Sequence, residues 1–138
     1  MKIPISKPYF GEEEKFAIQE PLETGWVVQG PKVAEFENLF ATYTGASHAL
    51  ATTSCTTALH LALIALGVGP GDEVIVPAVS WPTTYYPLYQ YGLKIKFVDI
   101  DAQTLNFDLI AWKEAITDNT RMIMAVNLLG NSNDYTAI

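Results

Sequence analysis

Hydrophobic and polar residues alternate along this chain with two different periods. Between Pro31 and Gly45, aliphatic and aromatic side chains recur every three or four residues, which predicts a helix over residues 32–43. A second run with the helical period covers residues 56–66, and Gly67 follows it as a stop signal. Shorter β-branched and apolar runs follow these segments. The pattern therefore predicts helices that alternate with strands.

The rest of the chain continues this alternation. We expect strands over residues 48–51, 73–76, 93–98 and 122–126, and further helices over residues 12–23, 82–91 and 108–116. Such an order predicts an α/β fold, in which a mostly parallel sheet is covered by helices on both faces. Ligands bind these sheets beyond the carboxyl ends of the strands, where helices begin.

Composition and charge limit the class of protein. The chain has 138 residues, of which 49% are hydrophobic and 17% charged, enough for one domain with a core. A net charge of −7 disfavours nucleic acids and anionic membranes as partners. The only cysteine is Cys55, so no intrachain disulfide can form, and the N-terminal residues lack the apolar core of a signal peptide. We expect a cytoplasmic protein, and two histidines with one cysteine argue against a metal site.

Hydroxyl side chains gather where the helix over residues 56–66 begins. Ser54, Thr56 and Thr57 surround Cys55 at this point. The first backbone N–H groups of a helix lack internal partners and carry partial positive charge, so they can hold a phosphate. Ser and Thr are also the usual residues that cap a helix. The sequence leaves both interpretations open, and the lack of a lysine here excludes a nucleotide P-loop.

Trp81 follows the strand predicted over residues 73–76. An indole at the carboxyl end of a strand can stack on a flat ring. In a doubly wound sheet this indole could face the same crevice as Ser54 and Thr56. An anion site beside an aromatic ring suits a cofactor that is flat at one end and phosphorylated at the other.

Three stretches resemble one family of enzymes. They read GWVVQGPKVAEFE, TSCTTALHLALIALGVGPGDEVIVP and KFVDIDAQTLNFD. They are similar to the DegT/DnrJ/EryC1/StrS aminotransferases, which are fold-type I enzymes that use pyridoxal 5'-phosphate (PLP) on nucleotide-linked keto sugars. The resemblance covers nearly all 138 residues and implies that residues 1–138 form the N-terminal part of the large PLP-transferase domain.

The resemblance implies specific roles for residues. Ser54, Cys55 and Thr56 would bind the PLP phosphate, and Trp81 would stack on the pyridine ring, with Thr84 supporting its loop. The family places substrate or the neighbouring subunit of a homodimer near two further positions. These positions are Pro8-Tyr9 and Trp26.

The family's catalytic residues have no counterpart here. The resemblance places the aspartate that faces the pyridine nitrogen, and the lysine that binds PLP covalently, beyond Ile138. We expect Lys94 and Lys96 on a strand and Lys113 on a surface helix, so none replaces that lysine. The chain alone should therefore not catalyse transamination, and none of its residues is a candidate for catalysis. Cys55 replaces a commoner glycine.

Three functions remain open on these grounds. The first is an aminotransferase that passes an amino group from glutamate through PLP to a keto sugar. The second is a sugar 3-dehydratase of the same family, which keeps PLP but replaces the lysine with histidine. Many members have a histidine where Asn127 stands, and the LGN run after it, together with residues 81–84 (WPTT), resembles that branch. The third is an inactive truncated relic.

Overall fold

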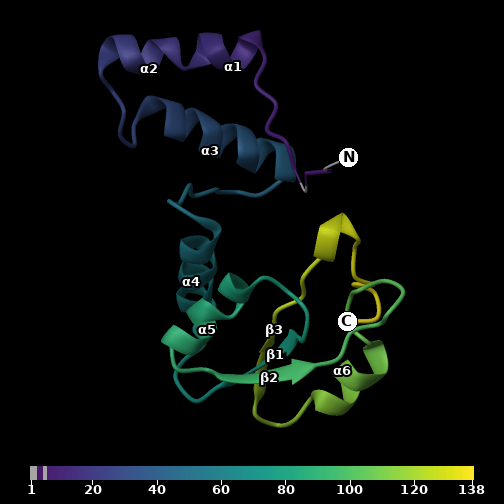
Figure 1. Ribbon diagram of the computed structural model, residues 1–138. Helices are drawn as coiled ribbons and strands as arrows, with labels where there is room; N and C mark the ends of the chain where they lie inside the picture. The colour runs from purple at the N-terminus through teal and green to yellow at the C-terminus, as the bar shows by residue number, and fades with distance from the viewer. Residues whose placement is uncertain (1–2, 5) are drawn as a thin grey trace. The chain divides into compact units, whose positions relative to one another are not determined.

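The computed structural model describes residues 3–4 and 6–138. The chain divides into two compact units, Met1–Ala51 and Thr52–Ile138. Figure 1 shows the chain from its N-terminus to its C-terminus. The N-terminal unit contains α1 (Glu12–Ala17), α2 (Gln19–Thr24) and α3 (Pro31–Thr44). The C-terminal unit contains α4 (Cys55–Ala65), β1 (Glu73–Pro77), the 3-10 turn η1 (Pro82–Thr84), α5 (Tyr86–Gln90), β2 (Lys94–Val98), α6 (Leu109–Ala115), β3 (Thr120–Ile123) and the 3-10 turn η2 (Leu128–Gly130).

The N-terminal unit confirms one predicted helix and divides another. Helix α3 has Pro31 at its first position and ends at Gly45, which takes the left-handed conformation with φ of 73°. The helix predicted over residues 12–23 is instead two helices that meet at Ile18. Pro21 lies in the first turn of α2, where a missing backbone N–H costs no helical hydrogen bond.

The strand predicted over residues 48–51 is wrong. The structure gives these residues no regular secondary structure. The backbone N–H of Ala51 donates to Glu37 Oε1 at 2.8 Å rather than to a neighbouring strand. A strand needs a partner for its backbone groups, and α3 supplies only a side chain.

The C-terminal unit is built around one parallel sheet. Strand β1 lies in the centre, and the strand order is β2-β1-β3. Glu73 is in register with Lys94 of β2 and with Thr120 of β3. Strand β3 begins earlier than the predicted range of 122–126 because its pairing starts at the amino end of β1. Beyond its end, Met124 still donates to the Ile75 carbonyl at 2.9 Å.

Helices cover both faces of this sheet, as the sequence predicts. Val74 and Val76 point to one face, where they pack with Leu63 of α4 and Leu88 of α5. Ile75 points to the other face, in the cluster that contains Trp112 of α6. The three β1 residues have no exposed surface, as expected for a central strand between two helical layers. Figure 1 shows α4 and α5 on one side of the strands and α6 on the other.

The helix predicted over residues 82–91 is divided into η1 and α5. Pro87 lies at the second position of α5 and has no N–H to donate, so a continuous helix through it would lack a hydrogen bond. Helix α6 agrees with its prediction. Asp108 caps it, accepting hydrogen bonds from the backbone N–H groups of Ile110 and Ala111 at 2.8 and 3.1 Å.

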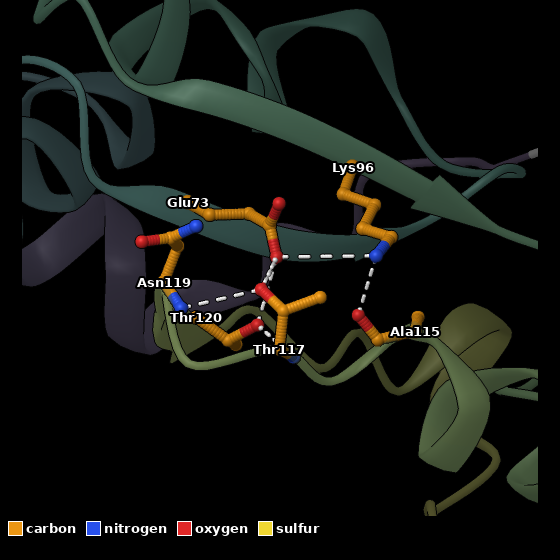
Figure 2. Close-up of polar contacts among 6 residues, drawn as sticks. All are labelled: Glu73, Lys96, Ala115, Thr117, Asn119 and Thr120. Carbon is orange, nitrogen blue, oxygen red and sulfur yellow. Dashed lines mark hydrogen bonds and ion pairs between the residues drawn. The ribbon is translucent and has the colours of Figure 1, made fainter.

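A polar cluster holds the amino ends of the strands together (Figure 2). Glu73 Oε1 accepts hydrogen bonds from Thr120 Oγ1 at 2.8 Å and from Thr117 Oγ1 at 3.0 Å. Lys96 Nζ lies 4.0 Å from the same oxygen and donates to the Ala115 carbonyl at 2.6 Å. The hydroxyl bonds, Thr120's first, lower the pKa of Glu73, although partial burial opposes them. The cluster lies at the amino end of β1, away from the carboxyl end where ligands bind such sheets.

Candidate functional site

The sequence-predicted cofactor residues lie on two elements that pack against each other in the C-terminal unit. Ser54, Cys55 and Thr56 form the start of α4. Trp81 lies directly before η1, in the loop that leaves the carboxyl end of β1. Helix α4 contacts η1, so the fold places α4 and the turn that follows Trp81 side by side.

Ser54 caps helix α4. Its backbone is extended, and its Oγ accepts a hydrogen bond from the Thr57 N–H at 3.1 Å. The same oxygen lies 3.0 Å from Thr57 Oγ1. The capping interpretation is therefore correct for Ser54, and two hydroxyls at the helix start are already engaged with each other.

The next two residues keep donors free. Within the described part of the chain, the backbone N–H groups of Cys55 and Thr56 donate to no protein acceptor, and neither does the Thr56 hydroxyl. The Cys55 side chain is exposed. These N–H groups carry the positive end of a helix of 11 residues. Free donors at such an end fit a phosphate group, so the capping and anion interpretations are compatible.

Trp81 presents its indole ring to solvent. Its side chain is 73% exposed, whereas Trp112, in the core beside β1, is 4% exposed. Pro82 follows it directly, and Trp81 takes the extended conformation (φ −70°, ψ 137°) that a following proline favours. The ring is therefore available to stack on a planar ligand rather than being used in the core.

The candidate substrate positions belong to the N-terminal unit. Pro8 is exposed, and Tyr9 is 86% exposed. Trp26 is 56% exposed, and its Nε1 donates to the Gln29 carbonyl at 3.3 Å. Its indole lies so close to Gly30 that a Cβ at residue 30 would come within 2.0 Å of Nε1. Trp26 also lines a small cavity of about 120 Å³ with Glu20, Thr24 and Lys32.

The lysines lie where the sequence predicts. Lys94 and Lys96 are on β2, and Lys113 is on α6 with an exposed side chain. Lys96 is held by the Ala115 carbonyl at the amino end of the sheet. None of the three lies on α4, η1 or the loop of Trp81.

Sequence reasoning missed two sets of contacts near the carboxyl ends of the strands. Tyr85 donates its phenolic hydrogen to the Pro77 carbonyl at 2.7 Å, at the carboxyl end of β1. Asn127, after β3, accepts three hydrogen bonds on Oδ1, from the N–H and Nδ2 of Asn133 and from the Tyr135 hydroxyl. Both contacts join residues that only the folded backbone brings together, and no local pattern signals them.

Within residues 3–4 and 6–138, no three His, Cys, Asp or Glu side chains gather in a way that could hold a metal ion. In the same part of the chain, no helix has the length and apolarity needed to cross a bilayer.

Comparison with known proteins assigns the chain. The model of the DegT/DnrJ/EryC1/StrS aminotransferase family matches residues 8–138. The chain belongs to this family. It corresponds to the N-terminal portion of the family's members, as the resemblance in the sequence implies.

Relatives of two kinds are similar to this chain. The GDP-4-keto-6-deoxy-D-mannose 3-dehydratase of Yersinia pseudotuberculosis is 46% identical over 144 residues, which cover 100% of this chain and 37% of that enzyme. The UDP-4-amino-4-deoxy-L-arabinose–oxoglutarate aminotransferase of Shewanella sediminis is 40% identical, over 99% of this chain and 35% of that enzyme. The chain thus spans little more than a third of the length of the curated relatives that it matches.

Solved structures of family members share the fold. The GDP-4-keto-6-deoxy-D-mannose-3-dehydratase of E. coli with bound hydrated PLP has a TM-score of 0.93 and 44% identity, over 99% of this chain and 36% of that one. The sugar aminotransferase Spr1654 of Streptococcus pneumoniae in its PLP-form has a TM-score of 0.91 and 37% identity, over 99% of this chain and 35% of that one. The chain therefore has the fold of a part of these PLP enzymes, with a parallel sheet between helices.

Proposed function

We propose that this chain supplies the phosphate and ring contacts for PLP in an enzyme that acts on nucleotide-linked keto sugars. The observation that carries the proposal is the start of α4, with free N–H groups at Cys55 and Thr56, on a helix that contacts the turn after the exposed Trp81. Its support is the family membership and the similarity to PLP-containing structures.

The residues would make two kinds of contact with PLP, one with its phosphate and one with its ring. The N–H groups of Cys55 and Thr56, with the hydroxyls of Ser54 and Thr56, would hold the phosphate dianion at the positive end of α4. Trp81 would fix the plane of the ring by stacking on it. When bound, PLP supplies an electron sink for bonds next to an amine. We assign none of the chain's residues to proton transfer, since its lysines lie on other elements.

Two reactions are candidates for the enzyme. The first is transfer of an amino group from glutamate to a keto sugar, as in the aminotransferase relatives. The second is removal of a sugar hydroxyl by a 3-dehydratase. One observation favours the second reaction. Two 3-dehydratases are 46% and 45% identical to this chain, whereas the Shewanella sediminis aminotransferase is 40% identical to it.

The remaining proposals concern the assembly. We propose that both units belong to one large PLP-transferase domain in a cytoplasmic homodimer, and that Pro8, Tyr9 and Trp26 lie near substrate or the second subunit. The large apolar side chains exposed on the N-terminal unit support a covering partner. A single exposed cysteine is consistent with a reducing compartment.

A titration with pyridoxine 5'-phosphate tests the cofactor site. This analogue carries the phosphate and the ring but no aldehyde, so it cannot react with lysines. NMR spectra of the chain would follow the backbone amides of Cys55 and Thr56 and the three indole N–H signals. We expect the amides and the Trp81 indole to shift with one dissociation constant, while the buried Trp112 indole stays unchanged.

Thr56→Ala makes this test sharper, because the Thr56 hydroxyl has no protein partner to lose within the described residues. We expect it to weaken binding by about fivefold, equivalent to ~1 kcal/mol for one hydrogen bond. Thr42→Ala in α3 is the matched control, since the Thr42 hydroxyl donates to the Asn38 carbonyl of its own helix. No binding by the unmodified chain would support the relic instead, and equal binding by Thr56→Ala would mean that the Thr56 hydroxyl does not contact the phosphate.

A further inference from the structure

The loop that carries Trp81, residues 78–85, is attached to the sheet at both of its ends. At its start, the Ala78 N–H donates to the Val98 carbonyl of β2 at 2.8 Å. At its end, the Tyr85 hydroxyl donates back to the Pro77 carbonyl at 2.7 Å. The Trp81 loop therefore leaves and returns at the carboxyl end of β1.

Hydrogen bonds inside the Trp81 loop fix its backbone. Ser80 Oγ and Thr84 Oγ1 lie 3.0 Å apart, on either side of the tryptophan. The Thr84 N–H donates to the Trp81 carbonyl at 2.9 Å, and the Tyr85 N–H donates to the Pro82 carbonyl at 3.0 Å. These bonds constrain the backbone on both sides of Trp81, although its indole is exposed and does not pack in the core.

The ring of Tyr85 is the anchor of this arrangement. It packs against the core cluster of Val76 and Leu88, and its edge meets Phe97 of β2 at a centroid distance of 5.2 Å. The phenol is a donor at neutral pH, as any tyrosine is, and partial burial raises the pKa of its hydroxyl further. Tyr85 thereby joins the Trp81 loop to the sheet through both its ring and its hydroxyl.

We propose that Tyr85 is a positioning residue that fixes the Trp81 indole for stacking on the cofactor ring. The inference rests on the proposed function, because it assigns a purpose to a constrained loop that exposes an aromatic side chain. Stacking on a mobile indole would first have to order it, whereas a fixed loop presents it already ordered. Tyr85 acts through Trp81 and need not touch the ligand itself.

Tyr85→Phe tests this role, because it keeps the ring and its packing but removes the hydroxyl that bonds Pro77. We expect pyridoxine 5'-phosphate to bind this variant about threefold to tenfold more weakly, since stacking on the indole is partly lost. Binding of inorganic phosphate should stay unchanged, because the start of α4 does not use Tyr85. Tyr89→Phe on α5 is the matched control, since Tyr89 is 78% exposed.

A double-mutant cycle with Trp81→Ala shows whether Tyr85 acts through the indole. We expect Tyr85→Phe to change affinity less than twofold once Trp81 is alanine. An equal loss in both backgrounds, or no loss in the unmodified background, would overturn the positioning role. If the unmodified chain bound no pyridoxine 5'-phosphate, the proposed function itself would fail. If it bound and Tyr85→Phe bound equally well, only this inference would fail.

Discussion

The two units of this chain are organised in opposite ways. In the C-terminal unit, β1 has side chains without exposed surface on both faces, and helices α4, α5 and α6 cover them. In the N-terminal unit, none of the described residues is buried, and large apolar side chains such as Phe16 and Phe40 are at least half exposed. One unit has its own core and the other does not.

This difference shows where the stability of the chain comes from. Alternate side chains of one central strand can pack against two layers, so β1 supplies a core within the C-terminal unit. The N-terminal helices have good local signals, such as Pro31 and Gly45 around α3, but their apolar side chains have nothing within the unit to bury them. We expect substitutions to affect folding stability accordingly.

The largest effect should come from the centre of β1. Ile75→Ala removes a side chain that has no exposed surface, and we expect it to lower the free energy of unfolding by about 2–5 kcal/mol. Val28→Ala, at a residue 74% exposed in the N-terminal unit, should change it by less than about 0.5 kcal/mol. Urea unfolding followed by far-UV circular dichroism would compare them. Equal effects would mean that the two units do not differ as described.

A smaller effect should follow from the helix caps. Asp108 caps α6 with its carboxylate, whereas the capping positions of α1 and α3 are Gly11 and Gly30, which have no side chain. Asp108→Ala should lower the free energy of unfolding by about 1 kcal/mol, measured by the same urea method. Asp108→Asn should keep most of the stability because its side-chain oxygen still accepts the hydrogen bonds. If Asp108→Asn lowered the free energy of unfolding as much as Asp108→Ala does, the charge of Asp108 rather than its capping hydrogen bonds would stabilise α6.

The smallest effect concerns the response to acid. The Thr120 hydroxyl, with that of Thr117, holds the pKa of Glu73 below its usual range. A carboxyl with a lowered folded pKa stabilises the fold above its unfolded pKa, and this contribution is lost as the pH falls through the folded pKa. Thr120→Ala should therefore raise the pKa of Glu73 and reduce the loss of stability between neutral pH and about pH 3.

Exposed carboxylates of the N-terminal unit provide the comparison for Glu73. The Lys15–Glu12 ion pair spans 2.6 Å, but its side chains are 63% and 90% exposed, so Lys15→Ala should leave the pH dependence of unfolding unchanged. Carboxyl signals followed by NMR against pH would report the pKa of each residue. A Glu73 that titrates alike with and without Thr120 would contradict the assigned cause.

The sequence was sufficient where local chemistry decides the structure. Pro31 and Gly45 bound α3, Asp108 caps α6, and the β-branched run of β1 is buried, all as predicted. The sequence was insufficient where a distant part of the chain must supply the hydrogen-bond partner. The strand predicted over residues 48–51 is absent, and the Ala51 N–H there bonds to the Glu37 side chain instead of a strand. Strand formation depends on distant pairing, which composition does not contain.

The candidate site likewise has residues that the sequence predicts and contacts that it does not. The hydroxyls at the start of α4 and the exposed Trp81 could be named from the sequence, since helix starts and strand ends have local signals. The contact that holds the Trp81 loop could not be named from the sequence, because the bond from Tyr85 to Pro77 spans eight residues. Nor could the bonds of Asn127 with Asn133, which depend on a turn in which Leu129 takes a positive φ of 53°.

The most direct test of the central claim is to locate a phosphorylated ring on the chain. Intermolecular NOEs between the methyl group of pyridoxine 5'-phosphate and the protons of assigned indoles would do so. The account predicts NOEs to Trp81, together with amide shifts at Cys55 and Thr56 that saturate at the same ligand concentration. NOEs to Trp26 alone, or amide shifts at the start of α4 with no NOE to Trp81, would contradict it.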